Sequence, residues 1–104
     1  MNDDELREQA RRATIAARGA QEQVEDEWSV YQSLVRMRME VGLRVQQALG
    51  KGDKDVEAHK AYAALLPRIE AQRRVLYQAM VDFEKSEVEL RAAFDAAFGS
   101  QAEE

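Results

Sequence analysis

The sequence predicts an all-α protein: a long antiparallel two-helix hairpin, coiled-coil-like, that dimerises into a four-helix bundle. Three observations lead to this prediction. Of 104 residues, 34% are charged and 45% hydrophobic, with five Gly and one Pro, a balance typical of long helices that pack. Apolar residues recur every three or four positions in both halves of the chain. One strong turn signal separates the halves near the middle, so a single domain over residues 1–104 is expected.

The first helix is expected over about residues 3–49. Asn2 can cap its N-terminus, and Glu5 three residues later completes a capping-box pattern. Its apolar positions form one stripe: Leu6, Ala10, Ala13, Ala17, Ala20, Val24, Trp28 or Tyr31, Val35, Val45 and Leu49, widened by Val30, Leu34, Met37, Val41 and Ala48. Gly19 and Gly42 weaken this helix. A break at Gly19 would leave a short separate N-terminal helix.

The turn is expected at residues 50–53 and a frayed tail at 99–104. Gly50 can take the left-handed conformation that ends a helix, because glycine has no Cβ to clash. Asp53 can then cap the helix that follows.

The second helix is expected over about residues 54–98. Alternating spacings of four and three continue for about five heptads and predict a coiled-coil seam: Tyr62, Leu66, Ile69, Arg73, Leu76, Met80, Phe83, Glu87, Leu90, Phe94 and Ala97. Leu65, Ala79, Ser86 and Ala93 flank it. Pro67 removes one backbone hydrogen bond. The heptad pattern continues in phase across it, so a kink is predicted and a break is not.

Folding the chain at the turn places Leu34 opposite Ile69 and Val41 opposite Tyr62. Toward the termini, alanines of the first helix face larger residues of the second, which lets the helices approach closely. The apolar stripes are wider than one partner helix can cover. Apolar residues left uncovered usually mark an interface, so a second copy or another helical protein is the expected partner.

The candidate interface residues are large side chains along these stripes, because aromatic and apolar anchors dominate binding energies. They are Trp28, Tyr31, Leu34, Met37, Ile69, Arg73, Leu76, Tyr77, Met80, Phe83, Leu90 and Phe94. Packing inside one hairpin is the alternative role for each. The charged residues Arg38, Arg73 and Glu87 interrupt the stripes. Either their stems lie along apolar neighbours while the charges reach water, or they pair inside the bundle and fix its register, with Glu27 as a partner for Arg73 or Arg74.

No residue pattern indicates catalysis, a cofactor or a metal. The chain has no cysteine, which excludes thiol catalysis and Cys-ligated metals. His59 is the single histidine and belongs to no Glu-x-x-His pair. The Gly50-Lys51-Gly52 run lacks the spacing of a phosphate-binding loop. We therefore expect no enzymatic activity, no cofactor and no small-molecule substrate.

The charge balance argues against two classes of partner. The formal net charge is −5, which makes nucleic acid and anionic lipid unfavourable. The one basic group, Arg7, Arg11, Arg12 and Arg18, lacks interleaved aromatic residues. The acidic N-terminus has no hydrophobic core of a signal peptide, and no apolar run approaches the ~20 residues that span a bilayer. No membrane insertion and a cytoplasmic location are expected.

The layout resembles small secreted hairpin proteins of the WXG100 type, and is also similar to helical chaperones and stalk proteins of type III and flagellar export machines. At the turn, the sequence has Leu49-Gly50-Lys51-Gly52 where the WXG100 family has Trp-x-Gly. Four residues after Tyr77 stands Val81 and not the acidic residue of that family's export signal. Two functions are therefore considered. The first is a self-associating structural adaptor or scaffold. The second is an export chaperone, stalk or secreted small subunit of such a secretion system.

Overall fold

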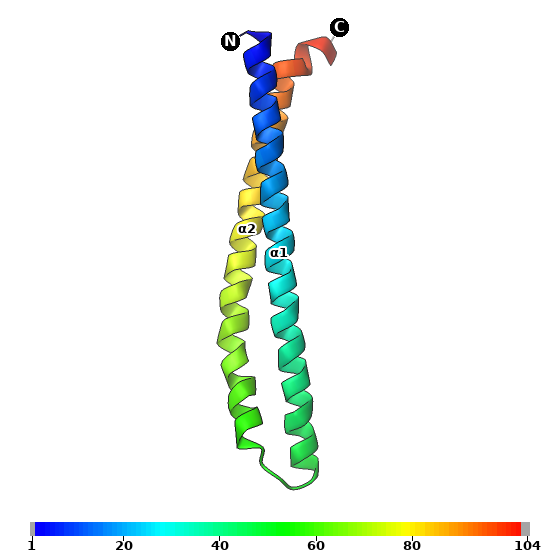
Figure 1. Ribbon diagram of the computed structural model, residues 1–104, viewed down its shortest axis with the longest axis vertical. Helices are drawn as coiled ribbons and strands as arrows, with labels where there is room; N and C mark the ends of the chain where they lie inside the picture. The colour runs from blue at the N-terminus through cyan, green and yellow to red at the C-terminus, as the bar shows by residue number, and fades with distance from the viewer. Residues whose placement is uncertain (1, 103–104) are drawn as a thin grey trace. The chain divides into compact units, whose positions relative to one another are not determined.

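The chain forms two long helices joined by a short turn (Figure 1). A computed structural model describes residues 2–102. Helix α1 spans Asp3–Gly50 and helix α2 spans Val56–Ala102, and no strand occurs within residues 2–102. The all-helical fold class is therefore confirmed. Both helices are continuous, so the break considered at Gly19 does not occur and Pro67 does not end α2.

The helices pack in two compact units, which are described one at a time. Unit 1 contains Met1–Glu25 and Tyr77–Glu104, and unit 2 contains Asp26–Leu76. In each unit a segment of α1 lies antiparallel beside a segment of α2 (Figure 1). The predicted antiparallel pairing of the two halves thus holds inside each unit. The single-domain organisation stays a prediction.

The N-terminal end of α1 is capped as expected. The Asn2 side-chain Oδ1 accepts a hydrogen bond from the Glu5 backbone N–H at 2.8 Å, which satisfies one of the free donors of the first turn. At the other end of the chain, α2 remains helical as far as Ala102. The frayed tail predicted for residues 99–104 is therefore helical over 99–102, and residues 103–104 lie outside the described part.

The turn differs from the prediction at both of its key positions. Gly52, not Gly50, has the left-handed backbone, with φ 73°, and Gly50 is the last residue of α1. The Gly52 N–H donates to the Leu49 carbonyl at 3.0 Å and the Asp53 N–H to the Ala48 carbonyl at 2.9 Å. These two bonds form a Schellman motif. Its left-handed glycine is Gly52, two residues later than the predicted Gly50.

The cap of α2 is Asp55 and not Asp53. The Asp55 Oδ1 accepts from the Ala58 N–H at 2.9 Å, the geometry of an N-cap side chain. The second carboxylate oxygen of Asp55 lies 3.4 Å from Arg44 Nη2 on α1. Several turn residues carry a capping side chain, and only the path of the chain selects among them.

The core of unit 2 is built from large aliphatic side chains. Leu34 of α1 packs with Leu65 and Ile69 of α2, each less than a tenth exposed, and three half-buried residues surround them, namely Tyr31, Val35 and Val41. The predicted juxtaposition of Leu34 and Ile69 is confirmed. Gly42 also has a packing role, because a Cβ there would lie 3.1 Å from the Tyr62 ring.

The interface of unit 1 uses small residues. Among the residues of unit 1 whose burial is described, Ala10 and Ala17 of α1 and Ala79 of α2 are the buried ones. Phe83 and Leu90 are half-buried beside them. Small side chains on both helices let the backbones approach closely but bury little apolar area.

The predicted seam of α2 is correct at alternate positions and wrong at the others. Ile69, Leu76 and the equivalent positions face α1, but a second set is exposed: Leu66, Arg73, Met80, Glu87 and Phe94. Their places in the seam are taken by the preceding residues, Leu65, Gln72, Ala79, Ser86 and Ala93, which are buried or half-buried. Two adjacent positions of each heptad are about equally close to the seam. The predicted seam followed the larger side chains, whereas in the structure the preceding, mostly smaller, side chains face α1.

Candidate protein-interaction surfaces

Large hydrophobic side chains are exposed in both units. Among the described residues, those at least about two-fifths exposed are Ile15, Trp28, Val30, Met37, Met39, Leu43, Leu49, Val56, Leu66, Val75, Tyr77, Met80, Val81, Val88 and Phe94. By contrast, the buried hydrophobic residues of the described part of the chain number eight, and four of them are alanine. Two surfaces, one in each unit, each contain several of these exposed side chains.

The first surface, the unit 2 groove, lies between α1 and α2. It has a volume of about 420 Å³ and is lined by Tyr31, Val35, Arg38, Met39, Gly42, Leu43, Gln46, Tyr62, Leu66, Ile69 and Arg73. Val35, Met39 and Leu43 follow one another at spacings of four and therefore share one face of α1. The groove is apolar except for two arginines, one glutamine and the phenol hydroxyls.

Arg38 is held in this groove by an aromatic contact. Its guanidinium carbon lies 4.2 Å from the centre of the Tyr62 ring, within the range of a cation–π interaction. Its Nε is buried and has no hydrogen-bond partner among the described residues. Arg38 therefore combines a covered stem with a charge that no carboxylate of the described chain neutralises.

Arg73 lies on the same groove and contacts Tyr31. Its Nη2 is 3.5 Å from the Tyr31 hydroxyl, and its guanidinium carbon is 6.0 Å from that ring. The hydrogen bond with Tyr31 raises the pKa of Arg73. Trp28 stacks on Tyr31 with ring centres 5.8 Å apart. Arg73 is thus an exposed cation beside an aromatic pair and does not occupy the helix seam.

Glu27 was expected to be a partner for Arg73 or Arg74, and that pairing stays a prediction. Glu27 does reach α2, where it forms hydrogen bonds with Gln72. The Gln72 amide donates to the Glu27 carboxylate at 2.7 Å and to the Glu27 carbonyl at 3.0 Å. A hydrogen bond to a charged group is stronger than a neutral one, so this polar pair helps to align the helices of unit 2.

The second surface, the unit 1 stripe, is an outward-facing row on α2. It consists of Tyr77, Val81, Glu84 and Val88, at spacings of four, three and four, which places them on one helix face. Tyr77 is 68% exposed and Val88 67%. Shallow depressions along the row are lined by Met80, Phe83 and Val24 on one part and by Lys85, Glu87 and Arg91 on another.

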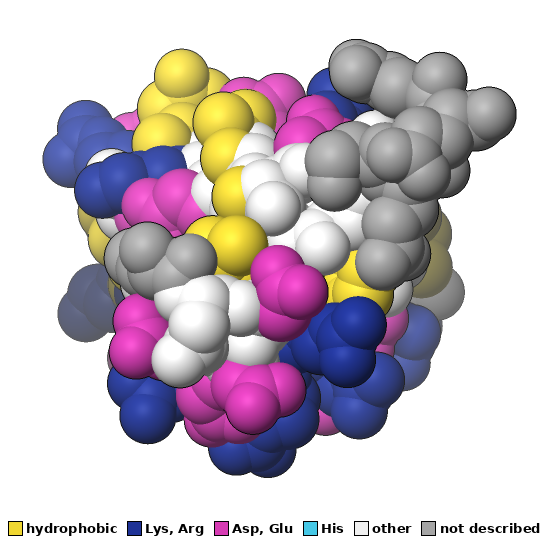
Figure 2. Space-filling model, turned by 90° about the horizontal axis from the view of Figure 1, so that it is seen from above, with side chains coloured by type: hydrophobic (Ala, Val, Ile, Leu, Met, Phe, Trp, Pro, Cys, Tyr) yellow, Lys and Arg dark blue, Asp and Glu magenta, His cyan; other side chains and the backbone are white. Residues whose placement is uncertain are grey.

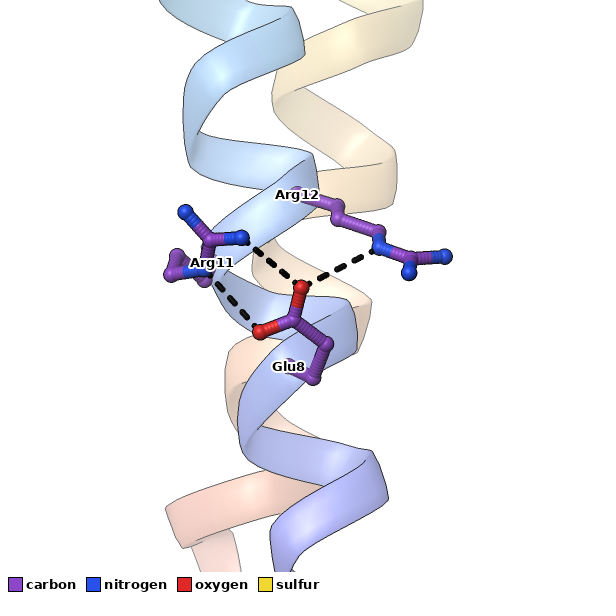
Figure 3. A network of polar contacts seen from close by, with 3 residues as sticks. All are labelled: Glu8, Arg11 and Arg12. Atoms are coloured by element: carbon purple, nitrogen blue, oxygen red, sulfur yellow. Dashed lines mark hydrogen bonds and ion pairs between the residues drawn. The ribbon is translucent and has the colours of Figure 1, made fainter.

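The best-defined polar cluster lies elsewhere, on the outer side of α1 in unit 1 (Figure 3). Glu8 accepts from Arg11 at 2.8 and 3.0 Å and from Arg12 at 3.2 Å. The Arg11 hydrogen bonds hold the pKa of Glu8 down at about 2, with Arg12 contributing less, and raise the pKa of Arg11. All three are surface groups. Viewed from above, acidic and basic side chains are intermixed around hydrophobic ones (Figure 2), without a large patch of one sign on that face.

The predicted interface residues divide into three classes of exposure. Leu34, Ile69 and Leu76 are buried inside unit 2; Tyr31, Phe83 and Leu90 are half-buried; and Trp28, Met37, Arg73, Tyr77, Met80 and Phe94 are exposed. The groove also contains Met39, Leu43 and Leu66, which were not candidates. The regular spacing from Val35 to Leu43 was the signal that could have identified the α1 side of the groove.

Residues 2–102 also lack the features of two other kinds of site. No group of three or more His, Asp or Glu side chains is arranged to hold a metal ion. His59 is exposed. Neither α1 nor α2 contains, over the described residues, a stretch both long and apolar enough to cross a bilayer.

The two surfaces can bind apolar side chains and, at Arg38 and Arg73, a carboxylate. The turn of unit 2 does not have the Trp-x-Gly sequence of the WXG100 type. Its residues are Leu49-Gly50-Lys51-Gly52, and the Gly52 N–H donates to the Leu49 carbonyl. No protein-family model, curated protein or solved structure matches the chain.

Proposed function

We propose that this protein is a non-enzymatic protein–protein interaction module, a helical hairpin that associates with itself and acts as a structural adaptor or scaffold. In this proposal two hairpins form a four-helix assembly. The cytoplasmic location expected from the sequence is part of it.

One observation carries the proposal: over the residues whose burial is described, the exposed large hydrophobic side chains outnumber the buried ones. The buried set contains Leu34, Leu65, Ile69 and Leu76, and its other four members are alanines. Each large aliphatic or aromatic side chain that moves out of water contributes about 1.5–3 kcal/mol. Covering even a few residues of the unit 2 groove or the unit 1 stripe would therefore add substantially to stability.

The accessible area supports the same proposal. The chain exposes 8010 Å², about a third more than the roughly 5,900 Å² expected for a folded monomer of its mass. A typical stable interface removes about 800 Å² from each partner. The excess is large enough to supply such an interface.

The electrostatics support a role without catalysis. Active sites shift pKa values through burial and converging charges. At Glu8, Arg11 and Arg73 the largest cause of the shifted pKa is a surface hydrogen bond to a nearby side chain.

Sedimentation equilibrium from about 1 to 200 µM, read together with circular dichroism, tests the proposal. We expect a helical species that is dimeric or larger and that dissociates on dilution. A fully helical monomer over the whole range would contradict it. A monomer with little helix would also contradict it, and would favour the export-chaperone alternative.

A further inference from the structure

We infer that the unit 1 stripe of one copy docks in the unit 2 groove of a second copy, as a third helix whose Glu84 carboxylate approaches Arg73 and Arg38. This inference rests on the proposed self-association and adds to it the two surfaces and the charge pair.

The residues that line the groove determine which side chains a complementary occupant needs. The apolar lining of the groove, which includes Val35, Met39 and Leu66, is suited to side chains that recur at spacings of three and four. Its charged residues are Arg38 and Arg73, both cationic, and neither forms an ion pair within the described chain. An occupant with a carboxylate inside an apolar row therefore complements the groove.

The unit 1 stripe has this pattern. Tyr77, Val81 and Val88 are its exposed apolar residues, and Glu84 lies among them. From Tyr77 to Val88 the row is roughly 16 Å long at 1.5 Å per residue. The α2 side of the groove, from Tyr62 to Arg73, covers the same number of residues. Glu84 forms no ion pair within the described chain.

The exposed apolar residue Ile15 of α1 fits the groove less well. Ile15 has Arg11, Arg12 and Arg18 within one helical turn, so its face would bring like charge to Arg38 and Arg73. Like charges across an interface cost affinity. The apolar row on α2 that contains Glu84 is therefore the complementary partner.

Two charge reversals test the inference. Arg73→Glu puts a carboxylate on the groove, and Glu84→Arg puts a cation in the stripe. Each variant alone juxtaposes like charges in its homotypic contact, and we expect self-association to weaken by about tenfold or more. In an equimolar mixture every groove–stripe contact between the two variants pairs opposite charges, so association is expected to return to within about threefold of the wild type.

Both positions are exposed, so circular dichroism should report unchanged helicity for each variant. The matched controls are Arg74→Glu and Glu89→Arg, exposed neighbours outside the two surfaces. They change net charge by the same amount and are expected to leave association unchanged.

The outcomes separate this inference from the proposed function. If the wild type associates but neither reversal weakens it, or if the mixture stays as weak as the separate variants, the groove–stripe contact is wrong and self-association stands. If each control weakens association as much as its matched reversal, general charge and not this pair is responsible, which also overturns the contact. If the wild type itself stays monomeric, the proposed function fails as well.

Discussion

Unit 1 and unit 2 are built from the same two helices but join them with different side chains. In unit 2, Leu34, Leu65 and Ile69 interlock, and the Glu27–Gln72 pair adds polar bonds between the helices. In unit 1, the buried positions are alanines such as Ala10 and Ala17. Large interlocking residues and a partly buried polar pair both favour one register. A row of alanines permits close approach but discriminates weakly between registers.

The residues that occupy the helix seam also explain why both units have solvent-exposed apolar side chains. Where alanine occupies the seam, the larger residues of the same heptads, such as Met80 and Phe94, remain at the surface. In unit 2 the seam is filled by larger residues, yet Met39 and Leu66 still line an open groove. Each unit thus retains an apolar surface, and the two surfaces differ in charge.

The largest expected effect concerns the aliphatic core of unit 2. Leu34→Ala should lower the free energy of unfolding by about 2–5 kcal/mol, because it leaves a cavity in a well-packed site. Urea unfolding followed by circular dichroism at fixed protein concentration measures the change. Leu49→Ala is the control, since that side chain is 53% exposed. Equal losses in both variants would show that Leu34 is not a packing centre.

The small-residue seam of unit 1 should respond to added volume. Ala17→Leu is expected to destabilise by about 1–3 kcal/mol, because the added side chain forces the helices apart. Ala16→Leu is the matched control. Ala16 is exposed, and alanine and leucine have nearly the same helix propensity. Thermal unfolding distinguishes the two. A stabilised Ala17→Leu variant would mean that unit 1 has room for larger residues, and the contrast between the units would disappear.

Two glycines of the unit 2 turn should respond to alanine substitution with stability changes of opposite sign. Gly52→Ala should destabilise by about 1–2 kcal/mol, because φ 73° is strained for a residue with a Cβ. Gly50→Ala should stabilise by about 0.4–1 kcal/mol, because Gly50 is helical and nothing lies within 4 Å of the added Cβ. Chemical denaturation of both variants measures the difference. The reverse order would indicate the turn first predicted, with Gly50 as the left-handed residue.

The smallest effect lies on the surface of unit 1. The folded pKa of Glu8, about 2, is below its ordinary value of 4.5. The ionised Glu8 therefore contributes stability above about pH 4.5, and this contribution is lost as the pH falls toward 2. NMR titration of the Glu8 carboxyl carbon should give a midpoint near 2. Arg11→Ala should raise that midpoint toward 4.5, while Arg7→Ala should leave it unchanged.

Several features of the fold could be predicted because they depend on local chemistry. Asn2 caps α1 because a short polar side chain precedes an acidic first turn. The heptad spacing identified α2. The heptad pattern stays in phase across Pro67, which predicted that the helix continues through this residue. The candidate surfaces were harder to predict from the sequence, because the exposure of Arg73 or Met80 depends on which of two adjacent positions faces α1.

Sequence alone therefore determined that this chain is helical, that it turns near its middle, and that it carries more apolar surface than one helix pair can cover. These properties follow from backbone hydrogen bonding, residue spacing and composition, which act locally. Only the tertiary structure decided which residues form the seam, that Gly52 and Asp55 close the turn, and that Arg38 and Arg73 share an apolar groove. Those choices depend on how closely two helices approach, and that distance is set by side-chain volumes from both helices together.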